Sequence, residues 1–145
     1  MTSPSTIFSI CNSVIFFGWL LLLILPTWKY TQAVILNGLL VIFSIVYTYL
    51  LLQDFDQLSI DSFSTLAKLK LLFQSDTAVA AGWVHYLVFD LFVGAYIVRK
   101  SIQIGLSRWV YSLILPFAFM CGPIGYLLFV IIKLIQTKSF YESND

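Results

Sequence analysis

Residues 7–25 read IFSICNSVIFFGWLLLLIL and contain no charged side chain. An α-helix rises about 1.5 Å per residue, so about 20 residues are needed to cross a hydrocarbon core of roughly 30 Å. An apolar run of this length is typical of a transmembrane helix and exceeds the apolar core of a secretory signal peptide. The stretch therefore predicts a helix that spans a membrane and is retained in the protein.

Three more stretches have the length and composition of a spanning helix. Residues 33–52 carry no charge, residues 77–98 contain two ionisable side chains, and residues 109–132 are uncharged but interrupted by two prolines. Lipid offers the backbone no hydrogen-bond partner, so a segment inside it is expected to be helical. Together with residues 7–25, these stretches predict an all-α fold, a polytopic membrane bundle of four helices in one domain over residues 1–145.

The overall composition agrees with a membrane protein. Of the 145 residues, 60% are hydrophobic and 10% are charged, whereas soluble proteins carry about 25% charged residues. A soluble domain of this size could not bury so much apolar surface. The net charge of +1 gives no electrostatic reason to expect a nucleic-acid partner. The motifs of soluble phosphate-binding, hydrolase and zinc-protease sites are absent from the sequence, and we expect no cofactor and no metal.

The connections predict how the four helices pair. The turn Pro26–Gln32 is short, so the first two helices are expected to be antiparallel neighbours, and residues 99–108 join the last two into a second hairpin. This topology leaves four basic residues at each end of the bundle: Lys68, Lys70, Lys133 and Lys138 at one end, Lys29, Arg99, Lys100 and Arg108 at the other. Equal numbers give no orientation by the positive-inside rule.

Residues 53–76, between the two hairpins, carry four of the seven acidic residues. Apolar residues recur there at roughly helical spacing: Phe55, Leu58, Leu66, Leu69 and Phe73. The pattern predicts a short amphipathic helix lying at the membrane interface, with Ser59 or Asp61 as its N-cap, and an ordered loop is the alternative.

The third predicted span is the most polar. Residues 82–92 read GWVHYLVFDLF, and an ionisable residue inside a span costs roughly 2.5–3.5 kcal/mol, so it needs a reason to be there. Asp90 is a candidate acid, base or substrate anchor, or else a structural partner of Asn12, Arg99 or a backbone group. His85 is the only histidine, which excludes bis-histidine haem ligation, and its role is left open. Five residues turn a helix by about 140°, so the two side chains are not expected to point at one spot.

Other residues in the spans are candidates for packing or for a binding slot. Asn12 is a candidate for an interhelical hydrogen bond. Pro116 and residues 122–125, which read GPIG, predict a kink in the fourth span that acts alone or also shapes a cavity. Cys11 and Cys121 lack redox or metal-ligand spacing and are interpreted as small buried hydrophobes.

Five aromatic residues either line a slot for a long isoprenoid or simply pack: Trp19, Trp83, Tyr86, Phe89 and Phe119.

Together these motifs resemble the neoxanthin-synthase-like family, which is named for a plant abscisic acid-deficient locus. The resemblance covers roughly residues 8–133, and its members are small proteins of about four membrane spans from plastid membranes and bacteria. The residues that carry it come from three of the spans and one turn: Asn12, Trp19, Pro26, residues 82–94, Pro116 and residues 122–125. It implies a multi-pass protein of a bacterial inner membrane or a plastid membrane.

The resemblance also implies carotenoid chemistry. Plant members are required to convert violaxanthin to neoxanthin, an isomerisation in which an epoxide opens to an alcohol while a vinylic proton leaves. An acid and a base are needed, and the implied catalytic residues are Asp90 and His85. The implied substrate-binding residues are Trp83, Tyr86, Trp19, Asn12, Phe89 and Arg99. The alternative is a non-catalytic membrane protein that binds a pigment, a lipid or a partner enzyme, and self-association into a homo-oligomer is left open.

Overall fold

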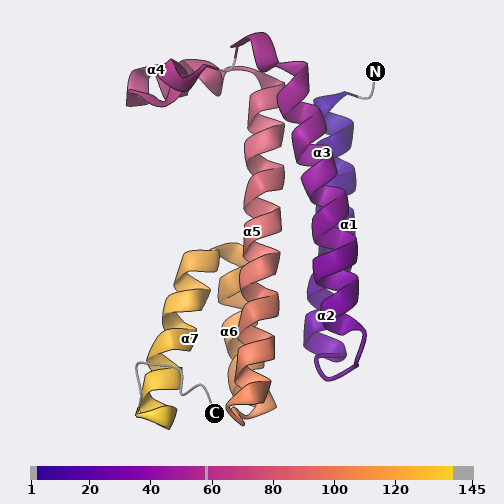
Figure 1. The fold of residues 1–145 in the computed structure, drawn as a ribbon, viewed down its shortest axis with the longest axis vertical. Coiled ribbons are helices and arrows are strands. Elements are labelled where there is room, and N and C mark those ends of the chain that lie inside the picture. The colour runs from indigo at the N-terminus through magenta and orange to yellow at the C-terminus, as the bar shows by residue number, and fades with distance from the viewer. Residues whose placement is uncertain (1–2, 58, 139–145) are drawn as a thin grey trace.

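The described residues, 3–57 and 59–138 of a computed structural model, form helices joined by short turns, with no strand among them. Three helices in this part of the chain are long and apolar enough to cross a membrane: α1 (Pro4–Ile24), the continuous helix Thr31–Gln53 and α5 (Asp76–Gln103). They run side by side in Figure 1. The prediction of an all-helical membrane protein is confirmed, whereas the number of four spanning helices is not.

The second spanning helix has three parts. It begins with α2 (Thr31–Ala33), continues through the π-helical segment η1 (Val34–Leu39), and ends with α3 (Leu40–Gln53). The Thr31 hydroxyl donates to the carbonyl of Leu25 at 2.5 Å and closes the turn after α1. Along most of their length, α1 and α3 pack against α5 rather than against each other, so α5 is the central helix.

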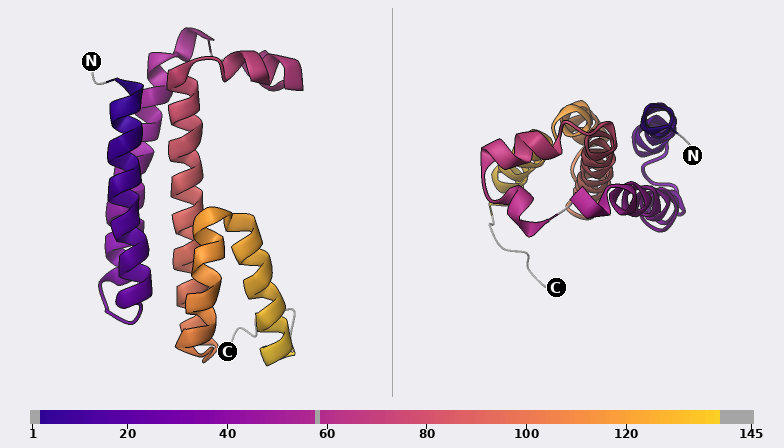
Figure 2. Two further views of the ribbon diagram at one scale, coloured as in Figure 1. Left: turned by 180° about the vertical axis from the view of Figure 1, so that it is seen from behind. Right: turned by 90° about the horizontal axis from the view of Figure 1, so that it is seen from above.

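The fourth predicted span, residues 109–132, is not one helix. It divides into α6 (Arg108–Met120) and α7 (Gly122–Thr137), and Cys121 between them is non-helical, with φ −154° and ψ 87°. Pro123 lacks an N–H to donate to the preceding turn and favours the start of a new helix. As Figure 2 shows, α7 folds back beside α6, and both pack against α5. Cys121 is exposed at this turn, contrary to prediction, whereas Cys11 is buried as predicted.

The segment between α3 and α5 forms short helices. After η2 (Phe55–Gln57), Ser59 caps η3 (Ile60–Phe63), and Thr65, not Ser59 or Asp61, caps α4 (Leu66–Leu72). Helix α4 projects sideways from the end of the molecule where α3 ends and α5 begins, away from α1 (Figures 1 and 2). An ion pair of 2.6 Å between Lys68 and Asp61 ties α4 to η3. The location of α4 at a membrane interface stays a prediction, and Leu58 lies outside the described residues.

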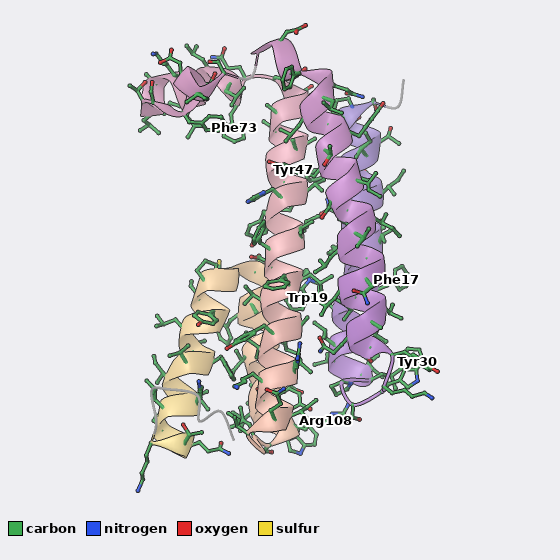
Figure 3. All side chains as sticks on the ribbon, in the orientation of Figure 1. Phe17, Trp19, Tyr30, Tyr47, Phe73 and Arg108 are labelled. Atoms are coloured by element: carbon green, nitrogen blue, oxygen red, sulfur yellow. The ribbon has the colours of Figure 1, made fainter. Side chains whose placement is uncertain are left out.

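The fold-back of α7 changes how the basic residues divide between the two ends of the bundle. The end of α7 lies at the same end of the molecule as the α5–α6 connection, where Figure 3 labels Arg108. Six basic residues therefore gather at this end: Lys29, Arg99, Lys100, Arg108, Lys133 and Lys138. Only Lys68 and Lys70 lie at the other end. By the positive-inside rule, the end with six basic residues is expected on the cytoplasmic side.

We expect residue 138 to be on the same side of the membrane as residue 107 and opposite residue 59. Single-cysteine variants S107C, K138C and S59C, in a chain with both native cysteines replaced by alanine, can be labelled in intact cells with a membrane-impermeant thiol reagent. S59C should react without lysis, whereas S107C and K138C should react only after it. Labelling of K138C together with S59C would instead indicate that residues 109–132 cross the membrane once.

Candidate functional site

A buried carboxyl group, that of Asp90, holds the turn between α6 and α7. Asp90 lies near the middle of α5 and is 5% exposed. Its Oδ1 accepts a hydrogen bond from the backbone N–H of Gly122 at 3.2 Å. A Cβ at residue 122 would overlap this carboxyl group, so only glycine allows the approach. The other oxygen, Oδ2, is buried and has no hydrogen-bond partner among the described residues.

Tyr86 holds the other side of the same turn. Its hydroxyl donates to the carbonyl of Met120, the last residue of α6. The last carbonyls of a helix lack partners within the helix, so this bond satisfies a group that lipid could not. The Tyr86 hydroxyl also lies close enough to the Asp90 carboxyl group to interact with it. Two side chains one helical turn apart on α5 therefore fix both ends of the α6–α7 turn.

A chain of contacts connects this turn to α1. The indole N–H of Trp83 donates to Oδ1 of Asn12 at 2.8 Å, which is the interhelical hydrogen bond that the sequence suggested for Asn12. The rings of Trp83 and Tyr86 lie 5.2 Å apart, and the ring of Phe8 covers Trp83 at 5.5 Å. These residues form a polar and aromatic strip across the face of α5 that meets α1 and the α6–α7 turn.

An apolar cavity of about 210 Å³ lies between α1 and α6. Trp19 and Phe119 line it with their ring centroids 5.4 Å apart, edge to face, and Pro116 contributes to its wall. The Trp19 ring also packs on α5 at Gly94, where a Cβ would lie 2.6 Å from it. Gly94 is one helical turn from Asp90, so Trp19 links the cavity to the part of α5 that carries the carboxyl group, although no residue of α5 lines the cavity itself.

The structure does not bring the remaining predicted site residues to this place. His85 faces another side of α5, where its ring lies 5.4 Å from that of Tyr47 and 4.6 Å from that of Phe89. Arg99 is exposed further along α5. His85 and Asp90 therefore lie on different faces of α5, as their five-residue separation predicts. Asp90 pairs with a backbone N–H rather than with Asn12 or Arg99.

Two partners in the site were not predicted, namely the carbonyl of Met120 and the N–H of Gly122. The sequence marked residues 122–125 as the place of a kink, but a backbone group has no sequence signal that names its tertiary partner. Within residues 3–57 and 59–138, no group of three or more His, Cys, Asp or Glu side chains could hold a metal ion. The site is therefore one carboxyl group, one phenol and backbone groups.

Replacing Trp83 by phenylalanine should lower the stability of the bundle modestly. The ring contacts are largely kept, but Asn12 loses its donor, and interhelical hydrogen bonds of this kind contribute about 0.6–2 kcal/mol. Thermal melting of the purified protein in detergent should show a midpoint a few degrees lower. Trp109→Phe, at a residue 81% exposed, is the matched control and should melt like the parent. Equal midpoints for both variants would contradict a contribution from this hydrogen bond.

Comparison with known proteins identifies the family. The model of the family described as ABA DEFICIENT 4-like matches residues 6–129, which include every residue of the site from Asn12 to Gly122. No curated protein and no solved structure matched the chain. The resemblance seen in the sequence is thereby confirmed.

Proposed function

Because this chain belongs to the ABA DEFICIENT 4-like family, we propose that it is an isomerase of an epoxycarotenoid or a related long isoprenoid, acting within the membrane. The observation that carries the proposal is the state of Asp90. One of its oxygens accepts a hydrogen bond from the N–H of Gly122, and the other is buried without a hydrogen-bond partner among the described residues. Trp19, which lines the apolar cavity between α1 and α6, packs on Gly94, one helical turn from Asp90. A carboxyl group arranged in this way can exchange a proton with an apolar molecule away from water.

The reaction needs one proton delivered and one removed. Protonated Asp90 gives its proton to the epoxide oxygen while the bond from that oxygen to the ring carbon next to the polyene breaks. The electron pair of the neighbouring vinylic C–H bond forms the second double bond of the allene. The oxygen stays on the other ring carbon as a tertiary alcohol. Atoms and electrons balance within the substrate, so no oxidant or reductant takes part.

Asp90 can serve in both proton transfers. Once it has given its proton to the oxygen, the carboxylate is a base close to the vinylic hydrogen, and taking that proton returns it to its starting state. The Tyr86 hydroxyl beside it can relay a proton between the two positions. His85 has no part in this scheme because it lies on another face of α5.

The surroundings fit a long apolar substrate. The rings of Trp19 and Phe119 offer flat apolar walls to a polyene, and the rings of Trp83 and Tyr86 form a second aromatic pair, of which Tyr86 lies beside Asp90. Since Oδ2 is buried, the substrate reaches it only when the protein groups that cover it move aside. The substrate would then take the place of the protein groups that cover the carboxyl group.

The test is to incubate the purified chain in mild detergent with violaxanthin and follow the pigments by chromatography and mass. A new product of unchanged mass supports the isomerase. Neither binding nor conversion overturns the proposed substrate.

One observation favours the alternative of a binding or assembly protein. Asp90 is buried and accepts a backbone hydrogen bond, which is also what a purely structural carboxyl group would do. Violaxanthin bound to the purified chain but recovered unchanged would favour this function over catalysis.

A further inference from the structure

A second cavity, of about 250 Å³, lies beneath α4, on a face of α5 other than the one that carries Asp90. Figure 3 shows Phe73 below α4, and Tyr47 on α3. The walls come from α3, α5 and the segment between them: Tyr47, Leu50, Leu51, Asp54, Phe63, Leu72, Phe73, Ala78, Ala81, Gly82 and His85. The functional site described above uses none of these residues.

Of the polar residues that line this cavity, Tyr47, which is half-buried, and His85, which is exposed, lie farthest along the helices from the ends of α3 and α5. Tyr47 lies about 10 Å along the helix from Asp54 at the end of α3, and His85 about 14 Å from Asp76 at the start of α5. At such depth in a membrane, water is not available to polar groups. Within the described part of the chain, the interactions of His85 are its ring contacts with Tyr47 and Phe89. The phenol and the imidazole are thus placed to bond a polar group of a ligand.

The roof and the rim of the cavity are built by specific contacts. Phe73, at the end of α4, packs on Gly82, where a Cβ would lie 2.9 Å from the Phe73 ring. The Ser75 hydroxyl donates to the carboxylate of Asp54 and so joins the start of α5 to the end of α3. The carboxylate at the rim repels an anionic ligand, and Lys68 on α4 is engaged by Asp61. A neutral ligand is therefore favoured over a fatty acid or a phosphate.

We propose that this cavity binds a neutral lipid alcohol, an apolar ring or prenyl chain whose hydroxyl group bonds to His85 and Tyr47. Imidazole and phenol each donate and accept hydrogen bonds, and so does an alcohol, so one hydroxyl group satisfies both. The apolar walls hold the hydrocarbon part. The proposal does not depend on catalysis at Asp90, which lies on another face of the same helix.

A photoreactive farnesol carrying a diazirine tests the proposal on the full chain purified in detergent. After irradiation, peptide mass spectrometry should place the label within residues 47–54 and 72–85. Unlabelled farnesol should compete better than farnesene, which lacks the hydroxyl group, and better than farnesoic acid, which is anionic. His85→Phe keeps the ring but removes its hydrogen bonds, so the advantage of farnesol over farnesene should fall about fivefold.

A pair of adjacent variants separates a cavity effect from a folding effect. Ala78→Phe fills the cavity and should abolish labelling, whereas Val79→Phe, at a residue 47% exposed and outside the lining, should leave it unchanged. The comparison of Ala78→Phe with Val79→Phe tests whether the ligand binds in this cavity even if His85→Phe fails to fold. Label in the cavity of Trp19, equal competition by farnesene, or equal labelling of the two phenylalanine variants would overturn the proposal. Asp90→Asn should be labelled as strongly as the parent protein, even where it no longer converts violaxanthin.

Discussion

Asp90→Asn should abolish the isomerisation of violaxanthin and leave the bundle folded. The asparagine amide cannot donate and recover a proton as a carboxyl group does, and loss of general acid–base catalysis costs about 10²–10⁴ in rate. The asparagine side chain is nearly the same size, and its carbonyl oxygen can still accept the hydrogen bond from Gly122. Product formation measured by chromatography should therefore fall below detection while the melting midpoint changes by only a few degrees.

The matched control is Asp56→Asn, the same change at an exposed residue of η2 far along the chain from the site. It should convert violaxanthin at the parental rate. Full turnover by Asp90→Asn would remove Asp90 from the chemistry. A large drop in its melting midpoint, with no conversion by the parent protein either, would assign the carboxyl group to folding and favour the binding function.

The three long helices could be predicted because each leaves a simple signal in the sequence. An uncharged run such as residues 7–25 is stable in lipid as a helix, and the structure has α1 over this run. Residues 109–132 carry the same hydropathy signal but form two helices. A kinked spanning helix and a folded-back pair differ mainly in the backbone of Cys121, and the sequence Gly122-Pro123 is compatible with both. Only packing against α5 and between α6 and α7 distinguishes them.

Part of the site could be predicted as well, because its side chains stand out from the apolar sequence around them. Asp90, Tyr86, Trp83 and Asn12 are polar or amphipathic side chains in apolar runs, and the structure connects them. Helical geometry also predicted that His85 and Asp90 lie on different faces of α5, and the structure shows them on different faces. Their partners on α6 and α7 could not be predicted, because the hydrogen bonds involve backbone groups that become available only when the chain folds back at Cys121.

The fold-back can be tested at the tightest contact between α6 and α7. A Cβ at Gly125 would lie 2.5 Å from the Cα, Cβ and backbone N of Ala118. Backbone atoms cannot rotate away as a side chain can, so Gly125→Ala should force the two helices apart. Overpacking of this kind costs about 1–3 kcal/mol. We expect the melting midpoint in detergent to fall by roughly 5 °C or more.

Gly38→Ala is the control, because a Cβ there meets no heavy atom within 4 Å. Alanine is favoured over glycine in a helix by about 0.5–1 kcal/mol, so this variant should melt at or above the parental midpoint. In one continuous helix over residues 109–132, Ala118 and Gly125 would lie about 10 Å apart along the axis and could not touch. Gly125→Ala would then also be neutral or stabilising. Opposite shifts for the two glycines therefore support the folded-back hairpin, and matching upward shifts would exclude it.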